Sequence, residues 1–121
     1  MYLLCIVVLL SQHKTVPPYM FELKKFCEEK GLFLLEDAAH AHGASIKGYK
    51  AGSIGDIGSF SFFPTKLITT GEGGMVTTNS KEIADYVKQV RHHGQKNGLM
   101  TEMGYNWRMP TLSAILGLSQ L

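Results

Sequence analysis

The stretch YMFELKKFCEEKGLFLLED, residues 19–37, predicts an amphipathic helix followed directly by a buried strand. Lysine and glutamate pairs occupy one side of the helix, and Gly31 is expected to end it. Residues 32–35 form a short apolar run that stops at Glu36 and Asp37, which we interpret as the end of a strand. The apolar side chains of the helix recur at helical spacing as one stripe: Tyr19, Met20, Leu23, Phe26 and Cys27.

A second apolar run, residues 3–10, precedes this helix, and Pro17 and Pro18 open the helix between the two runs. The run is continuously apolar and rich in branched side chains, which is typical of a strand covered on both faces. Strand, helix and strand at this spacing predict a βαβ unit with two parallel strands and a right-handed crossover. We therefore expect an α/β protein. The run is too short to span a bilayer and lacks the features of a secretory signal, so we expect no membrane partner.

The middle of the chain predicts loops and two further strands. Residues 43–58 are rich in glycine and favour loops with a small hairpin. Residues 59–63 and 75–78 read as strands on either side of a glycine-rich turn. Asn79 is expected to cap a second helix, with Glu82 completing the reciprocal cap.

The last third of the chain predicts two helices joined by a loop. The second helix is expected to bury Ile83, Val87 and Val90 and to end at Gly94. Residues 95–106 read as an exposed loop. A third helix is expected from Pro110, with apolar side chains at Leu112, Ile115, Leu116 and Leu121.

Length and composition describe one ordinary globular domain. The chain has 121 residues, of which 45% are hydrophobic and 18% charged, and its net charge of +2 is dispersed, so we expect no nucleic-acid partner. Cys5 and Cys27 lie among apolar neighbours, which favours buried, reduced thiols in a cytoplasmic protein. The chain starts in an apolar run and stops in an apolar helix without a C-terminal cap, so a piece of a larger domain is the expectation.

Asp37 is the first candidate for chemistry, because it follows the apolar strand at the carboxyl end, where open α/β sheets bind ligands. One interpretation is local: an N-cap for the following AAHAHG segment. The other is a carboxylate held in a poorly solvated crevice beside a cation. A protonated heteroaromatic nitrogen is such a cation.

Lys66 is the second candidate, because it follows the strand at residues 59–63 where a purely solubilising lysine is unusual. Desolvation disfavours the ammonium form of a lysine and frees a nucleophilic amine that reacts with aldehydes. The alternative is a surface lysine whose stem extends past Phe60 and Phe62.

A strand-end aspartate and an aldehyde-binding lysine together indicate pyridoxal phosphate chemistry. Ser61 is a candidate donor to the phosphate, although a strand hydroxyl is often merely solvated. His40 and His42 lie near Asp37, but no cysteine or glutamate cluster completes a four-ligand set, so no metal is expected.

Four motifs extend this interpretation: EDAAHAHGA (36–44), GSIGD (52–56), SFSFFPTKLITTGEGGMVTTN (59–79) and GYNWRM (104–109). In order and spacing they resemble the DegT/StrS-type aminotransferases. The resemblance implies part of an aspartate-aminotransferase-like large domain of fold type I, with a mixed, mostly parallel sheet and flanking helices, over residues 1–121. It also implies amino transfer from glutamate to a keto nucleotide-sugar in amino-sugar and surface-polysaccharide biosynthesis.

The same resemblance implies a role for each site residue. Lys66 would attach the cofactor aldehyde, Asp37 would pair with its ring nitrogen, and Ser61 would hold its phosphate. Asn106 would reach the phosphate of a neighbouring subunit's cofactor, which implies a homodimer with a shared active site. His40 stands where the family more often has glutamine, beside the ring hydroxyl. A sister group of dehydratases carries histidine in place of the lysine, so Lys66 favours amino transfer.

A second hypothesis comes from a different class of protein. The chain would then be a catalytically silent α/β module that acts only in association, through its GYNWRM loop and its exposed faces.

Overall fold

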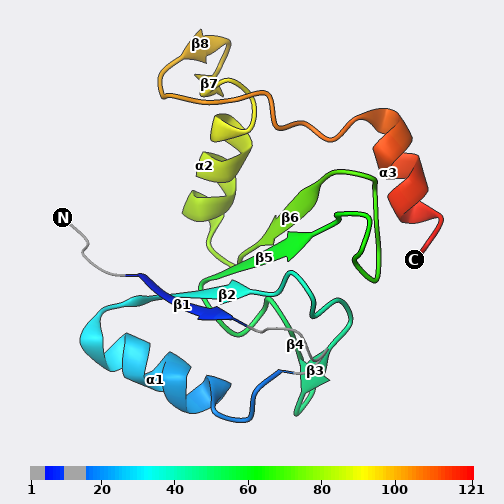
Figure 1. The fold of residues 1–121 in the computed structure, drawn as a ribbon. Helices are drawn as coiled ribbons and strands as arrows, with labels where there is room; N and C mark the ends of the chain where they lie inside the picture. Colours follow the sequence, from blue (N-terminus) through cyan, green and yellow to red (C-terminus); the bar gives the residue numbers. More distant parts are fainter. Residues whose placement is uncertain (1–4, 10–15) are drawn as a thin grey trace.

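The computed structural model of the protein describes residues 5–9 and 16–121. Within these residues a four-stranded sheet has the order β1-β2-β5-β6 (Figure 1). The first three of these strands are parallel and the last is antiparallel, so the expected mixed, mostly parallel sheet is confirmed. The strands are β1 (Cys5–Leu9), β2 (Phe33–Asp37), β5 (Ile57–Ser61) and β6 (Gly74–Thr77).

The predicted βαβ unit is present, with helix α1 (Met20–Lys30) between the parallel strands β1 and β2. Gly31 ends the helix as predicted, because its φ of 64° is in the left-handed region that glycine tolerates. Residues 3, 4 and 10 of the predicted first strand, and the side chain of Cys5, lie outside what the structure describes.

The apolar stripe of α1 is narrower than the sequence predicts. Met20 and Cys27 are fully buried, whereas Tyr19 and Phe26 are 56% and 43% exposed. Residues seven apart lie on one line of a helix, and the line through Met20 and Cys27 packs in the core with Leu34 of β2. Tyr19 and Phe26 are each offset from that line by one residue, about 100° around the helix.

Strand β2 runs two residues further than predicted and includes Glu36 and Asp37. Its backbone pairs with β1 and with β5 as far as Asp37, so the ladder continues although the side chains turn acidic. Side chains alternate between faces: Leu34 and Glu36 are fully buried, while Leu35 and Asp37 are half-buried. A carboxylate therefore occupies the core face of the central strand.

The buried carboxylate of Glu36 is satisfied by the loop that covers this face. Its Oε2 accepts a hydrogen bond of 2.7 Å from the Gly52 amide, and its Oε1 accepts from the amides of Ile54 at 2.7 Å and Gly55. Sequence reasoning missed this residue. The signal was available, because the two-residue period of a strand puts Glu36 on the same face as the apolar Leu34.

Asp56, at the end of the same loop, bonds back to β2. Its carboxylate accepts hydrogen bonds from the Leu34 amide at 2.8 Å and from Lys24 Nζ at 2.7 Å. Burial opposes ionisation, but these bonds to Leu34 and Lys24 outweigh it and lower the pKa of Asp56. The loop at residues 52–56 is thus bonded to β2 through both Glu36 and Leu34.

The other predicted strands are confirmed with small shifts in their bounds. The hairpin expected within residues 43–58 consists of β3 (Ser45–Ile46) and β4 (Tyr49–Lys50). Strand β5 starts and ends two residues earlier than the predicted 59–63, and β6 covers 74–77 in place of 75–78.

Helix α2 (Lys81–Val90) is capped by Ser80, so the prediction of Asn79 as cap is wrong. The extended backbone of Ser80 lets its hydroxyl accept a hydrogen bond from the Ile83 amide. The helix ends at Val90 with Arg91 as cap, four residues before Gly94. Its predicted buried face, Ile83, Val87 and Val90, is only half-buried.

The remaining segment contains more structure than the predicted loop. A second small hairpin, β7 (Gln95–Lys96) and β8 (Leu99–Met100), lies within residues 95–106. Helix α3 (Thr111–Leu118) starts after Pro110 as predicted, but its apolar side chains are exposed. Figure 1 shows α1 beside β1 and β2, with α2 and α3 beyond β5 and β6. In the described ranges, every helix is too short or too polar to cross a membrane.

Candidate active site

The carboxyl ends of the parallel strands β2 and β5 bring Asp37 and Ser61 to one edge of the sheet. Asp37 is paired in register with Ser59, and the amide of the next residue, Ala38, donates to Ser59 O at 2.8 Å. Ser61 lies two residues further along β5, roughly 7 Å in an extended strand. Figure 1 shows β2 and β5 pointing to the same side, where the segments that follow them lie.

His40 and Lys66 meet at this edge although 26 residues separate them in the chain. His40 comes from the turn after β2, and Lys66 from the turn after β5, in which its amide donates to Phe63 O at 2.9 Å. The Nζ of Lys66 lies 2.7 Å from Nε2 of His40. Lys66 as a whole is half-buried, whereas His40 is exposed. The structure therefore brings these two predicted residues into direct contact.

The side chains of Asp37 and Ser61 also make local bonds. Asp37 Oδ1 accepts from the Ala39 amide at 3.1 Å within a turn, and among the described residues no helix lies between β2 and β3, so the interpretation of Asp37 as a helix N-cap is wrong. The described residues offer its carboxylate no ion pair, so its charge is available to a ligand. Ser61 Oγ accepts from the Phe63 amide at 3.3 Å and keeps its own hydrogen for donation.

His42 is a buried histidine of the site that sequence reasoning treated only as a candidate metal ligand. Its side chain is 8% exposed and packs near the rings of Phe60 and Phe62, with centroid distances of 5.5 and 5.8 Å. Within the described residues neither ring nitrogen makes a hydrogen bond of ordinary geometry. Burial lowers the pKa of His42, the Ser61 backbone opposes this, and the nearby charges of Lys66 and His40 lower it further.

Because the pKa of His42 is lowered in the folded state, we expect this histidine to make the folded protein less stable in acid. The unfolded histidine takes up a proton near its ordinary pKa of 6.5, whereas the folded side chain resists protonation. The free energy of unfolding should therefore decrease as the pH falls from about 6.5 toward the lower pKa of the folded state. Urea unfolding of the wild type and of His42→Phe, at a series of pH values, measures the effect.

Phenylalanine is a suitable replacement because it packs between the same two rings and does not titrate. We expect the His42→Phe variant to lose less stability than the wild type between neutral and acidic pH. Parallel curves for the two proteins would contradict the prediction, because the remaining histidines are common to both.

Asn106 is the one predicted site residue that the structure does not bring to this edge. It is exposed and pairs by its backbone with His92, just after α2. Nearby, Tyr105 and Trp107 stack with their ring centroids 4.4 Å apart, and Arg108 contacts His92 Nδ1. Among the described residues, no contact joins Asn106 to the side chains at the edge.

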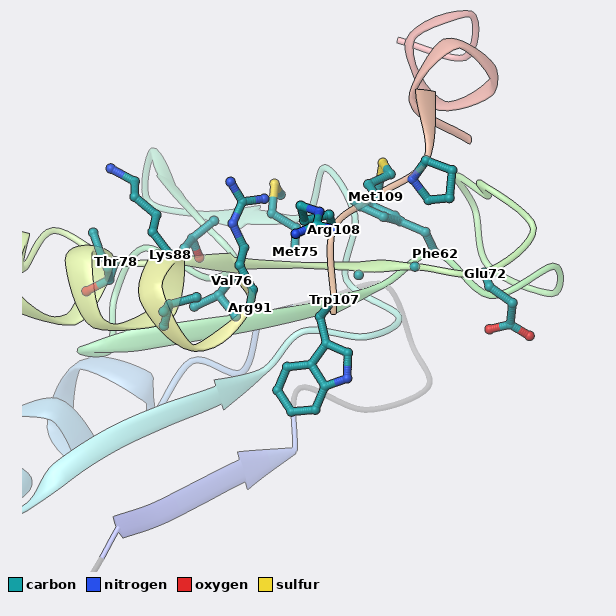
Figure 2. Close-up of a pocket in the computed structure, with 16 residues that line it drawn as sticks. Phe62, Glu72, Met75, Val76, Thr78, Lys88, Arg91, Trp107, Arg108 and Met109 are labelled. Carbon is teal, nitrogen blue, oxygen red and sulfur yellow. The ribbon is translucent and has the colours of Figure 1, made fainter. Parts of the chain in front are cut away.

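A wide groove of about 1020 Å³ lies away from these residues. It runs between β6, α2 and the segment that leads to α3, and Figure 2 shows Lys88 and Arg91 of α2 beside Met75 and Val76 of β6. Trp107, on the segment leading to α3, completes its lining (Figure 2). None of the predicted site residues lines it, so the groove and the candidate active site are separate features.

The donor set at the edge fits pyridoxal phosphate. The carboxylate of Asp37 suits a protonated ring nitrogen, the amine of Lys66 suits an aldehyde, and the hydroxyl of Ser61 suits a phosphate oxygen. Among the described residues, no group of three or more histidine, cysteine, aspartate or glutamate side chains is placed to hold a metal ion.

Comparison with known proteins agrees with this chemistry. The chain is 43% identical over 102 residues to GDP-perosamine synthase of Vibrio cholerae, covering 82% of this chain and 28% of that protein. It superimposes with a TM-score of 0.85 on an aminotransferase from Psychrobacter cryohalolentis, at 36% identity, covering 94% of this chain and 32% of that one.

Helicobacter pylori PseC, an aminotransferase involved in the biosynthesis of pseudoaminic acid, also gives a TM-score of 0.85. The identity is 33%, and the match covers 94% of this chain and 32% of PseC. The predicted fold class is therefore confirmed, and the chain spans less than a third of the length of these relatives. The model of the DegT/DnrJ/EryC1/StrS aminotransferase family matches residues 15–121, and the chain belongs to this family.

Proposed function

We propose that this chain carries the cofactor-attaching part of a pyridoxal-phosphate aminotransferase that acts on a keto nucleotide-sugar, with glutamate as the amino donor. The observation that carries the proposal is the contact between Lys66 Nζ and His40 Nε2 at the sheet edge where β2 ends in Asp37. Aminotransferases of this family depend on pyridoxal phosphate, and relatives such as GDP-perosamine synthase are named for amino-sugar synthesis.

Each residue of the edge has a task in this proposal. When bound, the cofactor supplies an aldehyde for the amine and a ring that accepts electrons. Lys66 would hold that aldehyde through its amine, and its free Nζ would carry a proton at the site. Asp37 holds the ring nitrogen in its protonated form by ion pairing. Ser61 donates its hydroxyl hydrogen to the phosphate, and His40 lies beside the ring hydroxyl.

The assembly is also part of the proposal. Asn106 lies apart from the edge of its own chain, so we place it at the cofactor phosphate of a second copy, in a homodimer with shared active sites. Residues 1–121 would form part of the large cofactor-binding domain, and the enzyme would work in the cytoplasm.

A silent association module is the competing proposal, and the exposed apolar side chains of α3 favour it. Leu112 and Leu118 are 81% and 70% exposed, which is unusual unless another surface covers them. Such a module would need neither the amine of Lys66 nor the carboxylate of Asp37. The two proposals therefore differ in whether the chain takes up pyridoxal phosphate at Lys66.

Mixing the chain with pyridoxal phosphate should give a yellow protein, and borohydride should then fix the cofactor to the peptide that contains Lys66. In Lys66→Met we expect at least tenfold less fixed cofactor, because Lys66 is the lysine that contacts His40 at this edge. Lys25→Met is the matched control, since the side chain of Lys25 is 77% exposed on α1. Equal fixation in the three proteins, read by peptide mass spectrometry, would remove the catalytic proposal and leave the association module.

A further inference from the structure

The contact between Lys66 and His40 determines which ring nitrogen of the imidazole carries the hydrogen. Nζ and Nε2 are 2.7 Å apart, so one hydrogen lies between them. An ammonium group has three donors and no acceptor, so Nε2 of His40 must accept when Lys66 is charged. The ring hydrogen of His40 then lies on Nδ1, and the lone pair of Nε2 points at the amine.

We propose that His40 is the proton acceptor for the Lys66 nitrogen when this nitrogen forms a bond to a carbonyl carbon. The inference deepens the proposed function and rests on it for the identity of the carbonyl compound. It adds a catalytic task to a side chain that has so far been placed only beside the cofactor ring.

The proton transfer balances without any further reactant. The Nζ lone pair forms the bond to carbon, and an N–H bond of Lys66 breaks with its electron pair remaining on nitrogen. That proton forms a new bond to His40 Nε2, and the positive charge moves to the imidazole. Over the whole condensation the nitrogen loses two protons, and the carbonyl oxygen gains two and leaves as water.

The surroundings select His40 over His42 for this task. His40 is exposed, so water stabilises its charged form and receives its proton afterwards. His42 is 8% exposed, and burial disfavours its charged form. Phe60 and Phe62 pack beside the ring of His42, so a charge there would face apolar carbon.

The first test is the tautomer of His40, read from the nitrogen chemical shifts of its imidazole in the wild-type chain. We expect the hydrogen on Nδ1. In Lys66→Met the donor is gone, and the hydrogen should move to Nε2, which free imidazoles favour. A wild-type His40 with its hydrogen on Nε2 would overturn the inference, because that nitrogen would then be a donor.

The second test measures how fast Lys66 condenses with 2-hydroxybenzaldehyde. This probe has no phosphate and no ring nitrogen, so it depends on neither Ser61 nor Asp37. The product is trapped with borohydride and counted on the Lys66 peptide, with Lys25 in the same sample as internal reference. We expect His40→Gln to slow condensation at Lys66 by roughly tenfold to a hundredfold, because glutamine hydrogen-bonds but takes up no proton. Unchanged rates would overturn the inference.

The outcomes separate this inference from the proposed function. If the chain does not bind pyridoxal phosphate but shows the Nδ1 tautomer and the His40-dependent rate, the inference is supported and the proposed function is contradicted. A chain that fixes the cofactor at Lys66 with equal rates in wild type and His40→Gln keeps the function and loses the inference.

Discussion

Replacing Glu36 by alanine is expected to lower the free energy of unfolding by about 3–5 kcal/mol, the largest effect of any substitution considered. The side chain is fully buried, and its carboxylate accepts from the amides of Gly52, Ile54 and Gly55. Removing it leaves the buried amides of Gly52 and Ile54 and the part-buried amide of Gly55 without their acceptor, and each buried amide costs about 1–3 kcal/mol. A domain of this size is stable by only about 5–15 kcal/mol, so the loss is a large share.

The matched test compares Glu36→Gln with Glu29→Gln by urea unfolding followed by circular dichroism. Glutamine at position 36 turns an NH₂ group toward amides that need an acceptor, so we expect a clear loss of stability there. Glu29 lies on α1 with its side chain 59% exposed, and its substitution should change the unfolding midpoint little. Equal midpoints for the two variants would show that the loop does not depend on the Glu36 carboxylate.

Gly94→Ala is expected to destabilise the segment that carries Asn106 and Trp107 by about 2–4 kcal/mol. Gly94 has a φ of 69°, and a Cβ there would lie 1.8 Å from the carbonyl oxygen of Glu102. The backbone must therefore move, and the bond from the His93 amide to Tyr105 O adjoins the clash. Amide hydrogen exchange of Tyr105 and Trp107 should become faster in the variant.

Gly98→Ala provides the control, because it isolates the cost of the backbone conformation from the clash. Gly98 has a φ of 81°, but a Cβ there would meet nothing within 4 Å. We expect this variant to lose about 1 kcal/mol, the ordinary cost of a left-handed alanine. If both alanine variants lose the same stability and leave amide exchange unchanged, the close approach of Gly94 to Glu102 does not contribute to the difference in stability.

The elements that depend on neighbouring residues were predictable from the sequence. The helical spacing in residues 19–30, the left-handed glycine at position 31 and the apolar runs on either side determine the βαβ unit. The positions of Asp37 and Ser61 at strand ends, and of Lys66 in the turn after β5, were predictable for the same reason, because a strand end is visible in a few letters. Even the wrong cap was a local error, in which Ser80 replaced its neighbour Asn79.

Contacts between distant residues were decided only by the tertiary structure. Lys66 contacts His40, the loop at residues 52–55 binds the Glu36 carboxylate, and His42 is buried. These contacts join segments that are far apart in the chain, and no periodicity in the sequence predicts them. Each depends on strand register and on which loop crosses which face of the sheet. The sequence by itself determined which chemical groups stand at strand ends. Packing determined which of them touch, because hydrogen bonds and burial act through space and not along the chain.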